Sequence, residues 1–209
     1  MNNKTVTVSR LKYALSYVSA QIEVKELIHH YRDTEKFIAY CKECNRYNAC
    51  WACPPFDFDT TKRLMNYKQA CIIGTKITLD NTLLNECTEV QQCKEASYQI
   101  IREVRHNIDR KLLALEQRYS GSLVFFAGTC HLCTQGECMR IFGKACLHPD
   151  KIRPSLEAFG FDIGKISLQL LNIELKWSKE KCLPEYFVLV SGLLTNENIR
   201  WYNLRQRND

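Results

Sequence analysis

The apolar positions of the chain predict strands in five stretches. TVTVS (5–9) and YALSYVSAQIEV (13–24) are rich in the β-branched and aromatic residues that strands favour. ACIIGTKITL (70–79) is a continuous apolar run with the length of a buried strand. SGSLVFFAGTC (120–130) predicts a turn followed by a strand, and EYFVLVSGLL (185–194) predicts a late strand.

Apolar residues at three- and four-residue steps predict one long helix over 88–119. VKELIHHYRD (24–33) predicts a short helix, and in DFDTTKRLMNY (57–67) aspartates and threonines are suited to cap another. From 153 to 173 we expect a further helical segment that begins at Ser155, whose side chain can accept from free backbone N–H groups.

Strands and helices therefore alternate, which predicts an α/β or α+β fold. We expect a mixed sheet flanked by helices, including the long one, with two cysteine-rich blocks at strand-to-helix junctions. Such a scaffold carries its chemistry on loops at one edge of the sheet. No linker or repeat interrupts the chain, so residues 1–209 are predicted to form one metal-binding domain.

Twelve cysteines in 209 residues are the unusual feature of the composition. The N-terminal stretch lacks the apolar core of a secretory signal, and no apolar run reaches the roughly 18–20 residues of a membrane span. We therefore expect a cytoplasmic protein without a membrane partner. In that compartment disulfides are rare, and clustered cysteines bind metal or carry out redox chemistry.

The net charge of +6 is modest and changes this picture little. We interpret the basic residues as a solvated helix face and a basic tail, a pattern too scattered to predict nucleic-acid binding. The helix face comprises Arg102, Arg105, Arg110 and Lys111, and the tail carries Arg200, Arg205 and Arg207.

Eight of the cysteines form two compact blocks. The first has the spacing C-x2-C-x5-C-x2-C, and the second has the spacing C-x2-C-x4-C-x7-C. Structural zinc sites commonly separate two C-x-x-C pairs by roughly 12–20 residues, whereas short nested spacings are typical of iron–sulfur clusters. The predicted metal ligands are Cys41, Cys44, Cys50 and Cys53 in the first block, and Cys130, Cys133, Cys138 and Cys146 in the second.

Three arrangements of these ligands remain open. Each block can hold one [4Fe-4S] cluster by four thiolates. Alternatively, Cys41, Cys44 and Cys53 hold a cluster whose fourth iron is open to substrate, with Cys50 as a neighbouring thiol. Zinc in one or both blocks is the third arrangement.

Four other residues accompany the blocks as expected neighbours of the metal. His131 and His148 can donate hydrogen bonds to cluster sulfurs, and Tyr47 and Trp51 can shield a cluster from solvent. The isolated cysteines are expected to be structural; these are Cys71, Cys87, Cys93 and Cys182. No nucleotide, hydrolase or radical SAM motif is present.

The segments CKECNRY…WACPPF and CHLC…C…CLHPDKIRPSLEAFGFDI resemble a family of predicted metal-binding proteins, domain of unknown function 2284. The resemblance extends over about residues 35–195 and marks Tyr47 and seven of the eight block cysteines, Cys50 being outside the pattern. The gap between Cys133 and Cys138 is also longer than in the family. The most specific matches are Cys146, Pro149, Arg153, Pro154, Ser155, Glu157, Ala158, Gly160 and Asp162. The family resemblance implies metal binding and no particular reaction.

Together these features predict a metal-binding protein with one or two iron–sulfur clusters that acts in electron transfer or as a redox accessory protein. One alternative is an enzyme with an open-iron cluster at Cys41, Cys44 and Cys53. The other is a zinc-stabilised binding module. The sequence does not predict which redox partner protein or small-molecule substrate the protein uses.

Overall fold

The computed structural model describes residues 13–133, 137–178 and 182–197. Four strands form one sheet in the order β1-β2-β4-β3, and all three pairings are antiparallel. The strands are β1 (Tyr13–Glu23), β2 (Gln69–Leu79), β3 (Leu123–Phe125) and β4 (Tyr186–Thr195). Of the two expected fold classes, the antiparallel sheet with its separate helices is α+β. The strand predicted over 5–9 and the basic tail lie outside the described residues.

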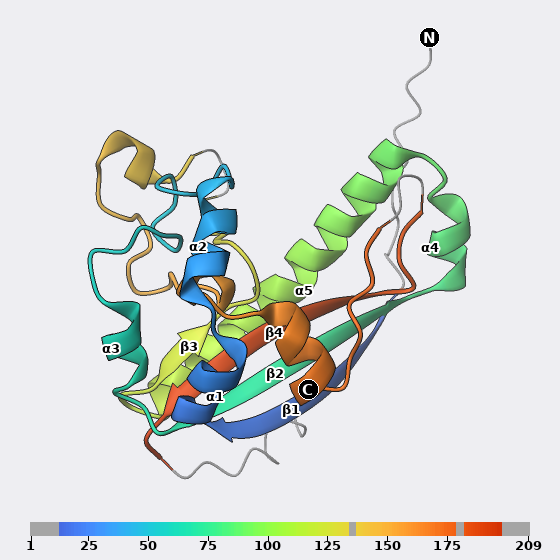
Figure 1. The fold of residues 1–209 in the computed structure, drawn as a ribbon. Helices are drawn as coiled ribbons and strands as arrows, with labels where there is room; N and C mark the ends of the chain where they lie inside the picture. The colour runs from blue at the N-terminus through green and yellow to red at the C-terminus, as the bar shows by residue number, and fades with distance from the viewer. Residues whose placement is uncertain (1–12, 134–136, 179–181, 198–209) are drawn as a thin grey trace.

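The helices lie on both faces of this sheet (Figure 1). The longest is α5 (Val90–Arg118), which confirms the predicted long helix within two residues at its start and one at its end. The others are α1 (Val24–Tyr31), α2 (Thr34–Lys42), α3 (Thr60–Leu64), α4 (Asn81–Glu86) and α6 (Ile163–Lys165), which continues into a π-helical turn, η3 (Ile166–Leu170). Two 3₁₀ turns, η1 (Met139–Phe142) and η2 (Glu157–Phe159), lie in the second half. Within the described residues, no helix is both long and apolar enough to cross a bilayer.

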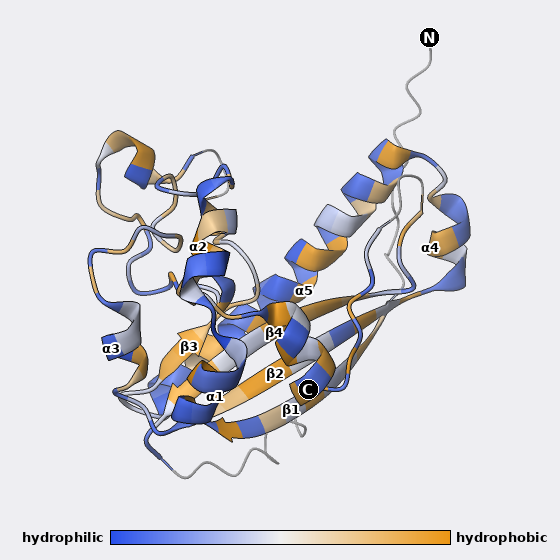
Figure 2. Cartoon of the chain, in the orientation of Figure 1, coloured by the Kyte–Doolittle hydropathy of each residue, from blue (hydrophilic) through white to orange (hydrophobic). Residues whose placement is uncertain are grey.

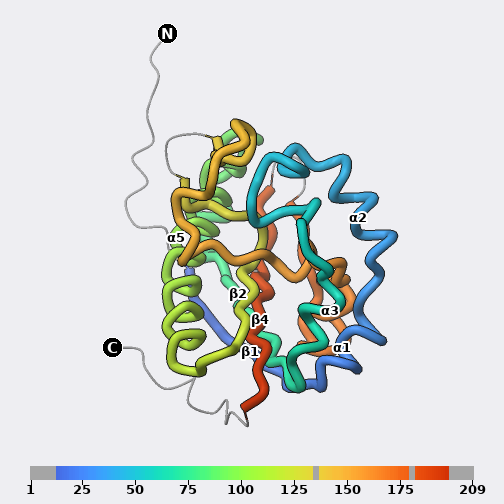
Figure 3. The backbone as a smooth tube through the Cα atoms, turned by 90° about the vertical axis from the view of Figure 1, so that its left-hand side faces the viewer, coloured from blue at the N-terminus to red at the C-terminus, as the bar shows by residue number. Residues whose placement is uncertain are grey.

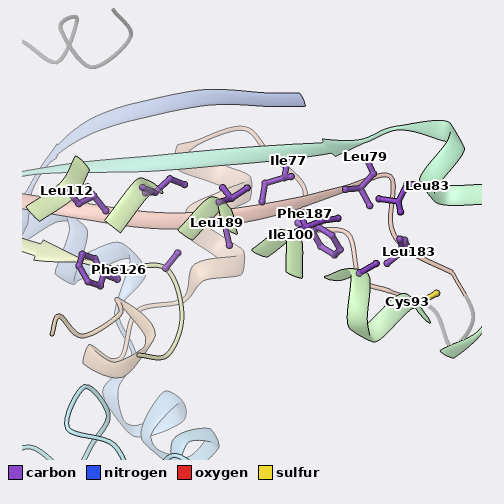
Figure 4. Close-up of a cluster of buried hydrophobic side chains, with 14 of the residues drawn as sticks. Ile77, Leu79, Leu83, Cys93, Ile100, Leu112, Phe126, Leu183, Phe187 and Leu189 are labelled. Carbon is purple, nitrogen blue, oxygen red and sulfur yellow. The ribbon is translucent and has the colours of Figure 1, made fainter. Parts of the chain in front are cut away.

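The two central strands are buried on both faces because their side chains alternate between two apolar layers. On one face, Ile77 of β2 and Leu189 of β4 pack with Ile100 and Leu112 of α5, as Figure 4 shows. On the other face, Ile72 and its neighbours pack against α1, η2 and η3. Figure 2 shows apolar and polar residues alternating along α5, as expected for a helix with one face on the sheet.

Aspartates begin several of the helices, and one of them lies in the predicted segment. The side chain of Asp59 accepts hydrogen bonds from the backbone N–H groups of Thr61 (2.8 Å) and Lys62 (3.0 Å), which confirms the predicted start of α3. Asp80 accepts from the backbone of Thr82 in the same way at the start of α4. The predicted helix beginning at Ser155 is wrong in its length, because η2 is a single 3₁₀ turn.

The short length of η2 has a physical cause at Gly160. This residue has φ +87°, a left-handed conformation that ends the turn and that glycine adopts without a side-chain clash. Ser155 still acts at the start of the turn, where its Oγ accepts from the backbone N–H of Ala158 at 3.3 Å. The helical segment resumes only at α6, where Asp162 caps the chain by accepting from Lys165 N at 2.9 Å.

Gly160→Ala should destabilise the fold more than Gly121→Ala, although both glycines have a left-handed backbone conformation. A Cβ at Gly160 would lie 2.9 Å from the Thr34 Cα, whereas Gly121 has φ +76° and nothing within 4 Å. Gly121→Ala should therefore cost about 1–2 kcal/mol for the conformation alone. Gly160→Ala should cost about 1–3 kcal/mol more for the forced contact, measured by urea unfolding. Equal losses in the two variants would contradict the close approach of η2 to α2.

Both cysteine blocks lie at one end of the molecule, beyond the sheet. In Figure 1 the loop after α2 and the loop that contains η1 meet at the upper left, and the turned view of Figure 3 keeps them together between α2 and α5. The first block was expected at a strand-to-helix junction, which is wrong, because it begins in the last turn of α2 and runs toward α3. A single sheet nevertheless brings the two blocks together.

Candidate metal centre

The first block is folded by two tight turns that bring its cysteines close in pairs. Cys44 N donates to Cys41 O at 3.0 Å, and Cys53 N donates to Cys50 O at 3.0 Å. Each C-x-x-C pair therefore has the turn that two thiolates need to reach one metal centre. Cys50 is buried at 2% exposure, whereas Cys44 is exposed. The block thus extends from the interior to the surface.

The second block follows β3 and contains η1. Its first cysteine, Cys130, is half-buried, and Cys138 is buried immediately before η1. The backbone N–H of His148 lies 3.3 Å from the Sγ of Cys146 and donates to it. In the first block the backbone N–H of Arg46 donates to the Sγ of Cys44 in the same way at 3.5 Å. Such N–H···S bonds stabilise thiolate sulfur and tune metal centres.

Thiols from the two blocks touch, although 80 positions separate Cys50 from Cys130 in the chain. Cys50 packs against Cys53 of its own block and Cys130 of the other, and its thiol interacts with both. Cys53 also interacts electrostatically with Cys44. On the other side, Cys133 interacts with Cys138, Cys146 and Cys50. The cysteines therefore form one continuous series of neighbours instead of two separate groups.

These sulfur contacts change the acidity of the thiols. Hydrogen bonds from Cys130 and Cys53 lower the pKa of Cys50, and the positive charge of Arg46 contributes in the same direction. The hydrogen bond with Cys50 in turn raises the pKa of Cys53 and of Cys130. The three neighbouring thiols therefore stabilise a thiolate among them, which is the form that binds metal.

Arg140 of η1 joins the two blocks. Its Nη1 donates to the carbonyl oxygens of Cys50 (2.9 Å) and Cys53 (2.6 Å), and its Nη2 donates to the carbonyl of Pro55. Its guanidinium also lies 5.1 Å from the centre of the Trp51 ring, a cation–π contact. Trp51 itself donates to Lys144 O at 3.0 Å. One residue of the second block therefore fixes the backbone of the first.

Arg140→Lys should loosen the first block although the charge is kept. An ammonium group cannot reach three carbonyl groups with the planar fork that the guanidinium provides. Loss of these hydrogen bonds should cost about 1–3 kcal/mol of stability, and the metal should be released to a chelator several-fold faster. Lys144→Ala is the matched control, since only its backbone carbonyl takes part. Unchanged release from Arg140→Lys would contradict the joining role.

A cavity of ≈ 280 Å³ lies between the second block and α5. Five cysteines line it, namely Cys50, Cys130, Cys133, Cys138 and Cys146, together with His131 and His148. Arg46, Arg102 and Arg105 also line it, and no carboxylate of the described residues does. Because metal–thiolate centres carry negative charge, the arginines provide the compensation that such a centre needs.

A buried ion pair supports this cavity from α5. Arg105 and Asp109 are 8% and 5% exposed, with Nη2 of Arg105 3.9 Å from Oδ2 of Asp109. Arg105 donates to Thr129 O at 2.6 Å, and His131 Nε2 lies 2.8 Å from Asp109 Oδ2. The pair therefore holds the residues on both sides of Cys130. The prediction that Arg105 belongs to a solvated helix face is wrong, because it carries these buried contacts.

The other predicted neighbours of the metal have different surroundings. Trp51 is 39% exposed and contacts Arg140 and Lys144, so it packs the loop and is absent from the walls of the ≈ 280 Å³ cavity. Tyr47 lines a second cavity of ≈ 250 Å³ together with Cys41 and Glu157. His131 and His148 line the first cavity, where the sequence places them beside the second block.

All twelve cysteines are free thiols. Burial raises the pKa of Cys71 in β2 to about 12, which makes this thiol inert. Cys93 is buried and donates to Cys87 O at 3.5 Å, and Cys182 is exposed. None of these four lines either cavity described above. These positions are consistent with the prediction that the four isolated cysteines are structural.

The donor set fits a metal that prefers sulfur. Eight thiols from two loops converge at one end of the fold, and thiolates select zinc, copper(I) or iron–sulfur clusters. Among the described residues, no group of three or more His, Cys, Asp or Glu side chains is arranged so that it could hold a metal ion.

The chain matches one known protein family over most of its length. No match was found among curated proteins or among solved structures. The family described as "Predicted metal-binding protein (DUF2284)" matches residues 23–195, which include every strand and helix except β1. This span also contains both cysteine blocks and the residues that join them. The chain therefore belongs to the DUF2284 family of predicted metal-binding proteins.

Proposed function

We propose that the two blocks hold iron–sulfur clusters of the [4Fe-4S] type and that the protein transfers electrons or assists a redox enzyme in the cytosol. The observation that carries this proposal is the contact of Cys50 with thiols of both blocks, Cys53 and Cys130. Two centres held by touching ligands are close enough to exchange electrons directly. In two-cluster ferredoxins, ligands of one sequence block likewise cross to the other cluster.

Three further features support clusters over structural zinc. The spacings within each block are short and leave no room for the hairpin or helix that separates zinc-binding pairs. Backbone N–H groups donate to the sulfurs of Cys44 and Cys146. Three arginines line the cavity at the second block, and together with N–H···S bonds and burial they set the potential of a cluster.

The series of thiols also offers a direction for the electron. Cys50 and Cys138 are buried, whereas Cys44 is exposed at the other end of the series. Cys44 therefore brings the first block to the surface, where a redox partner can reach it. The partner is either a protein or a small-molecule substrate.

A second function is favoured by the position of Cys50. Its thiol bonds to Cys130, and it lines the cavity of the second block. If Cys50 serves the second centre, Cys41, Cys44 and Cys53 are left as a three-thiolate set. A cluster held in this way has one iron without a cysteine, which can act as a Lewis acid on a substrate. The protein would then be an enzyme.

Cys50→Ser separates these two functions. Under the electron-transfer proposal with four thiolates per block, the variant should lose the iron of the first block. Under the three-thiolate arrangement, the first cluster should survive with an unchanged electron paramagnetic resonance spectrum after reduction. Iron and acid-labile sulfide in anaerobically purified protein give the readout, with Cys182→Ser as the control. Purified protein that contains stoichiometric zinc and no iron would contradict both functions.

A further inference from the structure

A buried carboxyl group lies beside the first cysteine block. Glu157 is the first residue of η2 and lines the ≈ 250 Å³ cavity that also contains Cys41 and Tyr47. Glu157 and Cys41 interact electrostatically, although 116 positions separate them in the chain. Glu157 therefore adds a carboxyl group to a cavity that is otherwise lined mostly by apolar residues, with one thiol and three hydroxyl groups.

The backbone fixes this placement. Arg32 Nε donates to Phe159 O at 2.7 Å, and Asp33 N donates to Gly160 O at 2.9 Å, so η2 is bonded to the residues that lead into α2. Gly160 allows the close approach to Thr34. Since α2 packs on η2 and carries Cys41 in its last turn, Glu157 and Cys41 belong to one rigid contact.

The carboxyl group is only partly satisfied by the protein. Its Oε2 is buried and has no hydrogen-bond partner among the described residues. Its other contacts are with its own backbone N–H and with the Ser155 hydroxyl, and burial raises its pKa. Arg105 is the cation that interacts with it. Leaving a carboxylate oxygen buried and unpaired is costly, so a positive partner at Oε2 would relieve that cost.

The first block also has a ligand position to fill. Cys50 hydrogen-bonds to Cys130 and lines the cavity of the second block, whereas neither Cys41 nor Cys44 does. Cys41 interacts with Cys44, and Cys44 interacts with Cys53. Cys41 is therefore the thiol that shares the cavity of Glu157, with Cys44 beside Cys41 and Cys53 beside Cys44.

We propose that Glu157 is a metal ligand, whose carboxylate binds the centre held by Cys41, Cys44 and Cys53. This inference rests on the second of the two functions proposed above, because it takes these three thiols as one centre without Cys50. Iron and zinc both accept carboxylate oxygen beside thiolate sulfur. A carboxylate there makes the first centre chemically different from the all-cysteine second centre, with one position held by a harder and more exchangeable donor.

Three variants of Glu157, with one control and one reference variant, test the ligand role by metal content and spectrum. Glu157→Gln keeps the shape and a carbonyl oxygen but removes the charge, Glu157→Ala removes the donor, and Glu157→Cys supplies a thiolate instead. Glu43→Ala is the control, since Glu43 lies between Cys41 and Cys44 in sequence but is exposed. The Cys41→Ser variant serves as the reference, because its metal content is that of protein without the first centre.

Glu157→Ala and Glu157→Gln should reduce the metal content toward that of Cys41→Ser, or release the first metal to a chelator at least about tenfold faster. Glu157→Cys should retain the metal and alter the electron paramagnetic resonance spectrum of the reduced protein. Circular dichroism and the metal of the second block report whether each variant is folded. A folded Glu157→Ala with wild-type metal content, release rate and spectrum would overturn the proposal.

The same experiment distinguishes failure of the proposed function from failure of the ligand role of Glu157. Wild-type protein with zinc in place of iron and sulfide overturns the iron–sulfur assignment, while loss of that zinc in Glu157→Ala still supports the ligand role. Wild-type protein that retains no metal after anaerobic purification overturns both. If Glu157→Ala and Glu157→Cys both misfold, Glu157→Gln decides, because the amide matches the carboxyl in size.

Discussion

Cys130→Ser should remove roughly half or more of the bound iron, because it deletes the thiol at which the two blocks meet. Cys130 bonds to Cys50 and lines the cavity with four other cysteines. A serine hydroxyl is a poor replacement for thiolate on a soft metal centre. Iron, acid-labile sulfide and the visible absorption of anaerobically purified protein measure the loss.

The control for this prediction is a cysteine outside the blocks. Cys182 is exposed and absent from both cavities, so Cys182→Ser should keep the wild-type iron. The sheet and α5 do not depend on Cys130 for their packing, so far-UV circular dichroism should be retained in both variants. Cys130→Ser with the full iron content would exclude Cys130 as a ligand.

Asp109→Ala should be the most destabilising single change in α5, with a loss of about 3–5 kcal/mol. It leaves Arg105 buried without its counter-ion, at 8% exposure, and it removes the partner of His131. Because Arg105 bonds to Thr129 and Asp109 bonds to His131, on the two sides of Cys130, the metal of the second block should also be released faster. Urea unfolding and chelator kinetics measure the two effects.

A double variant separates charge from packing in this prediction. Arg105→Met with Asp109→Ala removes both charges and should recover part of the stability that Asp109→Ala loses. Asp150→Ala, at an exposed carboxylate near the second block, should change stability by no more than about 0.5 kcal/mol. A double variant less stable than Asp109→Ala would show that the uncompensated charge is not the cause.

The sheet and α5 follow from the sequence because their apolar patterns are strong. Each of β1, β2 and β4 lies within one or two residues of its predicted range, and β3 falls within the predicted turn and strand. The unpredicted helix α2 has a different character, since none of its residues is buried. Without an apolar period, its only sequence signal is the Asp33 cap, which accepts from Lys36 N at 3.0 Å. That signal was too weak to place Cys41 on a helix.

The residues around the cysteines were largely hidden in the sequence. Cysteine spacing identifies the eight thiols, but no local pattern records the contacts of Arg140 with the first block. Glu157 is marked only by the family resemblance, which gives it no role. The ion pair of Arg105 and Asp109 has a signal in the sequence, because two opposite charges four residues apart lie directly beside the apolar stripe of α5. Such a pair is usually solvated, and only the tertiary fold turns it toward Thr129 and His131.

The metal content of protein purified without oxygen decides whether the two blocks hold iron–sulfur clusters. We expect iron and acid-labile sulfide in equal amounts, about four of each per filled block, with a broad visible absorption that fades on reduction. Near-zero iron and sulfide alongside stoichiometric zinc would show that the blocks hold no such clusters.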